Sequence, residues 1–301
     1  MTTILRPNEA EFLQKAAGYL ENPSYLTKIA ECVGKPVEWV LTKVDKVSPI
    51  STTEIIDCML KGIMKGAVAN LPKDILDLDF QDAYEKSIRD GRWHTTTTAF
   101  TGGLGGLFGP AALAVELPIS TGVMFRSIAS TARNFGRDLA DPETFLDCVS
   151  VFSYGGGPST DDAMDSTYLT MRMTMATEMR VAAQFLAKNT GETFAQQIAK
   201  GNCPAVIAFL SRVAARFNLT LTPKMAAFLV PGISVGTGAL VNSAFAQHFN
   251  RVAEYHFGME RLAANYGDDL VWEEYRKAAI KGRRGSEASP STTRRIGPPA
   301  P

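Results

Sequence analysis

The sequence is poor in cysteine and histidine and has no net charge. Its four cysteines lie far apart without a CxxC pair, and only three histidines accompany them. These counts exclude a disulfide scaffold and give no zinc-site spacing, so we expect no metal ion and no cofactor. Lys and Arg total 31, as do Asp and Glu, so overall charge does not favour nucleic acid as a partner.

Targeting and catalytic motifs are also missing. The first residues, MTTILRPNEAEF, lack the basic stretch and apolar run of a signal peptide. We therefore expect a cytoplasmic protein, free or at the cytoplasmic face of a membrane. The mean hydropathy of −0.03 argues against a polytopic membrane protein. No GxSxG or HExxH motif occurs, so the sequence assigns no catalytic residue.

Helical periodicity dominates what is present, and no segment indicates a strand. Two uncharged runs stand out, 17 residues over 99–115 with five glycines and 23 residues over 225–247 with Pro231 and three glycines. Their GxxxG spacings, such as Gly102 with Gly106 and Gly232 with Gly236, allow helix backbones to approach closely. We predict an all-α multi-helix bundle with these two glycine-rich segments at its centre. Re-entrant insertion of the runs into lipid is the alternative to packing in the core.

The composition predicts one domain over 1–281, made of N-terminal helices over 1–95 and a glycine-rich core over 96–281. Residues 282–301 mix Gly, Pro, Ser and Arg without apolar periodicity, which predicts a disordered tail. Asp141, followed by Pro142, predicts a helix start.

A basic stripe is predicted on the helix that follows Pro118. Arg126, Arg133 and Arg137 occupy positions i, i+7 and i+11, which share one helix face, and apolar residues fill most of the remaining surface. Such a helix can lie on an anionic membrane with its arginines at the headgroups. A core helix with a solvated basic face is the other interpretation.

Several polar residues near apolar segments are candidates for ligand binding. Tyr168 and Arg172 are four residues apart and share one flank of a predicted helix over 163–188. His248 lies on an apolar stripe, where a structural histidine is the common alternative. We expect Glu116, Arg126, Arg172 and Asn242 to gather against the apolar centre. The full candidate set is Glu116, Arg126, Tyr168, Arg172, Asn242 and His248.

Three stretches of the chain resemble the EcsC family, over about residues 30–270. The first runs from FTGGLGG (100–106) through Glu116-Leu117-Pro118 to RSIA (126–129). The second is the glycine loop 155–157 that leads to Tyr168 and Arg172. The third runs from VPG (230–232) through Asn242 and Phe249 to Phe257. The resemblance implies a helical protein, and the family's gene neighbourhood beside an ABC-transporter pair implies a membrane-related role.

Composition, basic stripe and resemblance together favour a peripheral membrane protein that binds lipid or another hydrophobic small molecule. Its partner would then be a membrane lipid or a membrane protein. A hydrolase acting on a lipid-like substrate and a soluble protein-interaction module are the alternatives.

Overall fold

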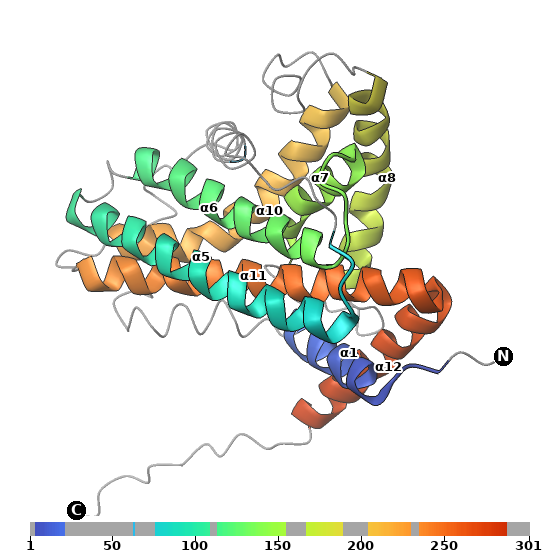
Figure 1. Ribbon diagram of the computed structural model, residues 1–301. Helices are drawn as coiled ribbons and strands as arrows, with labels where there is room; N and C mark the ends of the chain where they lie inside the picture. Colours follow the sequence, from blue (N-terminus) through green and yellow to red (C-terminus); the bar gives the residue numbers. More distant parts are fainter. Residues whose placement is uncertain are drawn as a thin grey trace, which may run out of the picture.

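The computed structural model of the chain is helical (Figure 1). It describes residues 4–21, 63, 76–108, 113–154, 167–188, 204–229 and 235–287. Over these residues there are eight α-helices, one 3-10 helix and no strand, which confirms the all-α prediction. The elements are α1 (Pro7–Leu20), α5 (Phe80–Phe108), α6 (Leu113–Asn134), α7 (Pro142–Ser150), η2 (Val151–Ser153), α8 (Thr167–Lys188), α10 (Pro204–Leu229), α11 (Val235–Tyr266) and α12 (Asp268–Glu287).

The long helices α5, α6 and α11 lie side by side and form the centre of the bundle (Figure 1). The most extensive interface joins α5 to α11. On one side of α11, α1 packs against α12. On the other side, α8 packs against both α7 and α10. Helix α11 therefore contacts both peripheral groups and holds them in fixed positions.

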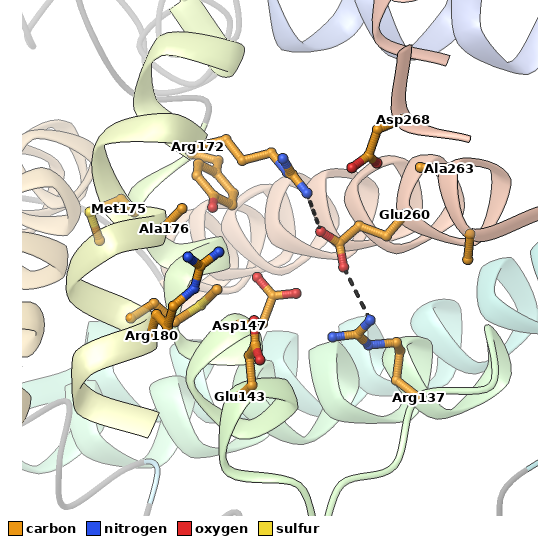
Figure 2. A pocket seen from close by; sticks show the side chains of 13 residues that line it. Arg137, Glu143, Asp147, Arg172, Met175, Ala176, Arg180, Glu260, Ala263 and Asp268 are labelled. Carbon is orange, nitrogen blue, oxygen red and sulfur yellow. Dashed lines mark hydrogen bonds and ion pairs between the residues drawn. The ribbon is translucent and has the colours of Figure 1, made fainter. Parts of the chain in front are cut away.

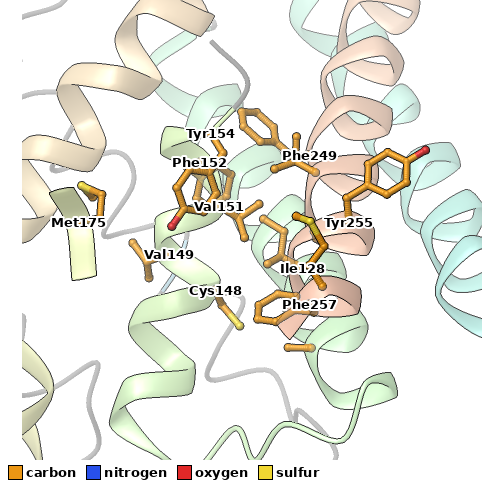
Figure 3. Packing of buried hydrophobic residues seen from close by; sticks show 14 of the residues in the cluster. Ile128, Cys148, Val149, Val151, Phe152, Tyr154, Met175, Phe249, Tyr255 and Phe257 are labelled. Carbon is orange, nitrogen blue, oxygen red and sulfur yellow. The ribbon is translucent and has the colours of Figure 1, made fainter. Parts of the chain in front are cut away.

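Aromatic and aliphatic side chains from α6, α7, η2, α8 and α11 form one continuous core (Figure 3). Within it the Phe152 ring meets the Phe249 ring edge to face, with centroids 5.0 Å apart. Such pairs stabilise a core beyond the area that they bury. Because these helices share a core, the polar groups at its edge are held rigidly.

The two glycine-rich runs take different forms. The first lies largely within α5, whereas the described parts of the second belong to α10, which ends at Leu229, and to α11, which begins at Val235. The side-chain surroundings of Gly106 and Gly236 lie outside the described residues, so their contact stays a prediction. None of the helices that the structure describes has the length and apolar character needed to cross a membrane.

Two helices cross boundaries that the sequence predicted. The division at residues 95 and 96 falls inside α5, which is one helix because it packs along α11 on both sides of that point. Helix α12 continues to Glu287, six residues beyond the predicted end of the domain at 281. A single glycine such as Gly282 costs a helix only about 1 kcal/mol, so it does not end α12. The remainder of the predicted tail, 288–301, lies outside the described residues.

Candidate functional site

A polar cavity of about 500 Å³ lies where α7, α8, α11 and the start of α12 meet the turn after α6 (Figure 2). Charged side chains of both signs line it, and arginines approach the same space from α8 and from that turn. The charged residues are Arg137, Arg172, Arg180, Glu143, Asp147, Glu260 and Asp268. Convergent polar groups in a concave site are typical of ligand binding.

A glycine at the end of α6 brings Arg137 to this cavity. Gly136 has a φ of 81°, which favours glycine. Its N–H donates to the carbonyl of Arg133 at 2.9 Å, and the N–H of Arg137 donates to the carbonyl of Ala132 at 3.0 Å. This pair of bonds is a Schellman motif, so α6 stops at Asn134 and the chain turns toward α7.

The ends of α7 and α11 at the cavity are also fixed by local bonds. The carboxylate of Asp141 accepts hydrogen bonds from the N–H groups of Glu143 and Thr144, both at 3.2 Å, which confirms the predicted helix start. Gly267, with a φ of 94°, ends α11 through a bond from its N–H to the carbonyl of Ala263 at 2.8 Å.

A buried hydrogen-bonded chain runs from the core to the cavity wall. Tyr168 Oη lies 2.6 Å from His256 Nδ1, and His256 Nε2 lies 2.9 Å from Asp147 Oδ1. All three residues are at most 3% exposed. Because an ionised carboxylate only accepts, Nε2 carries the hydrogen in this bond, and in the neutral ring Nδ1 accepts from the phenol. Acid, imidazole and hydroxyl therefore follow in the order used by catalytic triads.

Burial and neighbouring charge set the acidity of this chain. Burial, assisted by the nearby Tyr154, raises the pKa of Tyr168 well above its usual value, so the phenol keeps its proton. Burial alone would raise the pKa of Asp147, but the interaction with His256 and the charges of Arg137 and Arg172 outweigh it and lower that pKa. The cavity therefore presents an ionised carboxylate at Asp147.

A second polar group, around Glu260, lies beside Asp147 at the cavity (Figure 2). Arg172 Nη2 donates to Glu260 Oε1 at 2.7 Å, and Arg137 Nη1 lies 3.5 Å from Glu260 Oε2. The guanidinium of Arg172 also lies over the Trp272 ring, 4.4 Å from its centroid. One carboxylate thus serves two guanidiniums, which have further N–H groups to donate to an anionic group.

The two groups also bring together atoms that could ligate a metal ion. One ligand atom each from Asp147, His256 and Glu260 lie within 4.8 Å of one another. His256 and Glu260 are four residues apart and share one face of α11.

The structure brings only part of the predicted constellation together. Arg172 lies at the cavity, but Asn242 Nδ2 donates to the carbonyl of Thr98 on α5, at 3.3 Å. Asn242 precedes Glu260, the partner of Arg172, by 18 residues on α11. About 27 Å of helix therefore separates these two residues. The predicted gathering is therefore wrong for Asn242. The side chain of Glu116 lies outside the described residues.

The other predicted residues divide between the site and the core. Tyr168 belongs to the hydrogen-bonded chain, whereas His248 is 1% exposed and its Nδ1 lies 3.1 Å from Tyr19 Oη. Burial lowers the pKa of His248 to about 4, so it is neutral in the folded protein. Arg126 lies near His94 on α5, where burial and then the charge of Arg126 lower the pKa of His94.

The predicted basic helix face is wrong at Arg137. Helix α6 contains Arg126 and Arg133 but ends at Asn134, so Arg137 does not share their face. The glycine at 136 supplies the signal that this prediction overlooked, because glycine commonly follows the last helical residue. Arg137 belongs instead to the cavity beside Glu260.

Sequence reasoning missed three of the main groups of the site, which are Asp147, His256 and Glu260. Asp147 is an acid in the otherwise apolar stretch FLDCV of α7, and a buried acid of this kind needs a partner. The i, i+4 spacing of His256 and Glu260 is visible in the sequence. Nothing in the sequence indicates that Asp147, 109 residues from His256, completes the group.

The described residues thus form an α-helical bundle with a charged cavity between its helices. The chain matches the EcsC protein family over residues 14–262, which is most of its length, and it belongs to that family. No curated protein and no solved structure shows significant similarity to the chain.

Proposed function

We propose that this EcsC-family protein is a peripheral membrane protein that binds the headgroup of a lipid or lipid-like amphiphile in the cavity. The observation that carries the proposal is the charged wall, where Arg137 and Arg172 share Glu260 and Arg180 supplies a third guanidinium. Guanidinium groups recognise phosphate through paired hydrogen bonds. The carboxylates of the same cavity suit the amine of a zwitterionic headgroup.

The size and surroundings of the cavity support a headgroup rather than a whole lipid. A volume of about 500 Å³ suits a small polar group, and charged side chains line most of it. Acyl chains would then remain in the bilayer. We therefore expect the protein to bind at the membrane surface.

Helix α8 carries an apolar surface directly beside the cavity arginines. Met173 follows Arg172 and is 66% exposed, and Val181 follows Arg180 and is 51% exposed. Successive helical residues lie about 100° apart, so the apolar side chains lie next to the charged ones. This arrangement favours a membrane surface, with arginines at the phosphates and apolar side chains inserted between lipids.

Vesicle flotation tests the proposal. The purified chain should float with vesicles containing phosphatidylglycerol more than with phosphatidylcholine alone, and less at high salt. The double variant Arg172→Gln, Arg180→Gln should bind about 30-fold more weakly, because each arginine contributes about 1 kcal/mol at an anionic surface.

The matched control removes two cations from the exposed part of α12, Arg276→Gln with Lys281→Gln, and should change binding by less than about threefold. Soluble glycerophosphoglycerol should compete with the vesicles if the headgroup enters the cavity. Absence of flotation at low salt, or equal flotation of cavity and control variants, would overturn the proposal.

A hydrolase acting on a lipid-like ester is the second candidate, favoured by the triad-like order of Asp147, His256 and Tyr168. We favour binding over hydrolysis because Asp147 lines the cavity and Tyr168 does not. Release of fatty acid or headgroup from the same vesicles by the native chain, and not by Tyr168→Phe, would distinguish hydrolysis from binding.

A further inference from the structure

We propose that Asp147, His256 and Glu260 form a three-ligand site for a divalent transition-metal ion. The site goes beyond the lipid proposal, because it binds the metal without lipid. It also differs from the sequence expectation of no metal, which rested on the spacing of cysteines and histidines. Here the ligands come from two helices, α7 and α11, that only the tertiary structure brings together.

The distances between the three ligand atoms fit one bound ion. Atoms that ligate one metal at about 2.1 Å lie about 3.0 to 3.4 Å from each other. His256 Nε2 and Asp147 Oδ1 are 2.9 Å apart, and an oxygen of Glu260 completes a group within 4.8 Å. A metal ion can replace the proton between Nε2 and Oδ1, and a rotation of the Glu260 side chain closes the third distance.

Neighbouring groups hold two of these ligands in position. Tyr168 Oη, 2.6 Å from His256 Nδ1, can accept the hydrogen that Nδ1 carries when Nε2 binds a metal. Ser150 Oγ lies 3.2 Å from Asp147 Oδ1. Both partners are buried, so the ligand orientations exist before a metal arrives.

Two arginines contact the third ligand, Glu260, whose side chain turns toward the other two ligands to bind an ion. The Glu260 oxygens lie 2.7 Å from Arg172 and 3.5 Å from Arg137. A carboxylate offers about four lone pairs, so one oxygen can ligate a metal while still accepting a guanidinium bond.

One oxygen of Asp147 is open to the cavity. The side chain of Asp147 is 3% exposed and lines the cavity, and both of its hydrogen bonds to described side chains end on Oδ1. Its second oxygen, Oδ2, makes none with the described part of the chain. Because Asp147 lines the cavity, Oδ2 can accept an ion or the water that an ion carries.

Charge and donor type decide which ion fits. The cavity wall carries four carboxylates against three arginines, so a divalent cation reverses a formal charge of −1 to +1. One imidazole and two carboxylates suit Zn²⁺ or Mn²⁺ better than Ca²⁺, which prefers six to eight oxygens. Three protein ligands leave a position open toward the cavity, where a water molecule or a phosphate oxygen can bind.

Metal titration without lipid tests this site. The full chain, stripped with a chelator and dialysed, should bind one Zn²⁺ or Mn²⁺ per chain in calorimetry and retain it through desalting. Co²⁺ should bind at the same site and give visible absorption bands. Glu260→Gln and Asp147→Asn should each weaken binding by at least about tenfold and remove the bands.

The matched control is His248→Gln, because His248 is equally buried, eight residues earlier on α11, and also bonded to a tyrosine through Nδ1. It should bind the metal within about twofold of the native chain. Glu260 borders the cavity, so its variant is expected to fold even where a change at Asp147 prevents folding, and far-ultraviolet circular dichroism checks this. Failure of the native chain to bind any of the three ions, or equal binding by Glu260→Gln and the native chain, would overturn the site. Either result leaves vesicle flotation unaffected.

Discussion

Replacement of Gly258 by alanine should destabilise the protein, although alanine is the better helix former. Gly258 lies in α11 against the ring of Phe12 from α1. A Cβ atom built on Gly258 would lie 2.9 Å from Phe12 Cε1 and closer still to Cζ. Real Cβ atoms do not approach ring carbons this closely, so the ring or one of the two helices must move.

The size of the effect follows from how firmly the Phe12 ring is held. It packs at about right angles against the rings of Phe80 and Tyr84, each 5.1 Å away, and lies 5.5 Å from Tyr255. Overpacking such a core costs about 3 kcal/mol, at the upper end of the usual range, because the ring has little space to move. The higher helix propensity of alanine offsets about 1 kcal/mol of this cost. We therefore expect Gly258→Ala to lower the free energy of unfolding by about 2 kcal/mol.

Urea denaturation followed by far-ultraviolet circular dichroism measures this loss as a lower midpoint at constant slope. Gly18→Ala in α1 is the matched control, because a Cβ there meets nothing within 4 Å. It should raise stability by up to about 1 kcal/mol. The double variant Phe12→Leu, Gly258→Ala should lose less than the sum of its single changes, because the smaller side chain removes the clash. A Gly258→Ala protein as stable as the native chain would refute the reasoning.

Two further predictions concern a buried histidine and a partly buried arginine. The folded pKa of His248, about 4, lies below its unfolded value of 6.5, so unfolding takes up a proton and stability falls as the pH drops from about 6.5 to about 4. Urea titrations across this pH range should show a total loss of unfolding free energy of about 3 kcal/mol in the native chain and none in His248→Gln. An equal pH dependence in both proteins would contradict the prediction. Arg172→Lys keeps the charge but loses the flat contact with Trp272 and part of the bonding to Glu260. It should lower the unfolding free energy by about 1 to 2 kcal/mol, and an unchanged urea midpoint would argue against these contacts.

The sequence by itself determined the helical class, the family and some local features. Apolar residues at helical spacing specify helices whatever packs against them, and no competing strand pattern occurs. The start of α7 at Asp141 was also predictable, because a side-chain cap depends on neighbours two and three residues away. Tyr168 and Arg172 were identified as candidates from their spacing on one helix.

Only the tertiary structure decided where the charged groups meet. A single turn at Gly136 removes Arg137 from the basic helix face and places it beside Glu260, 123 residues later. Asp147 and His256 are 109 residues apart and become neighbours because α7 and α11 share a core. Helical periodicity records which face of a helix is buried but not which helix covers it. The cavity therefore depends on long-range packing, which local sequence patterns do not encode.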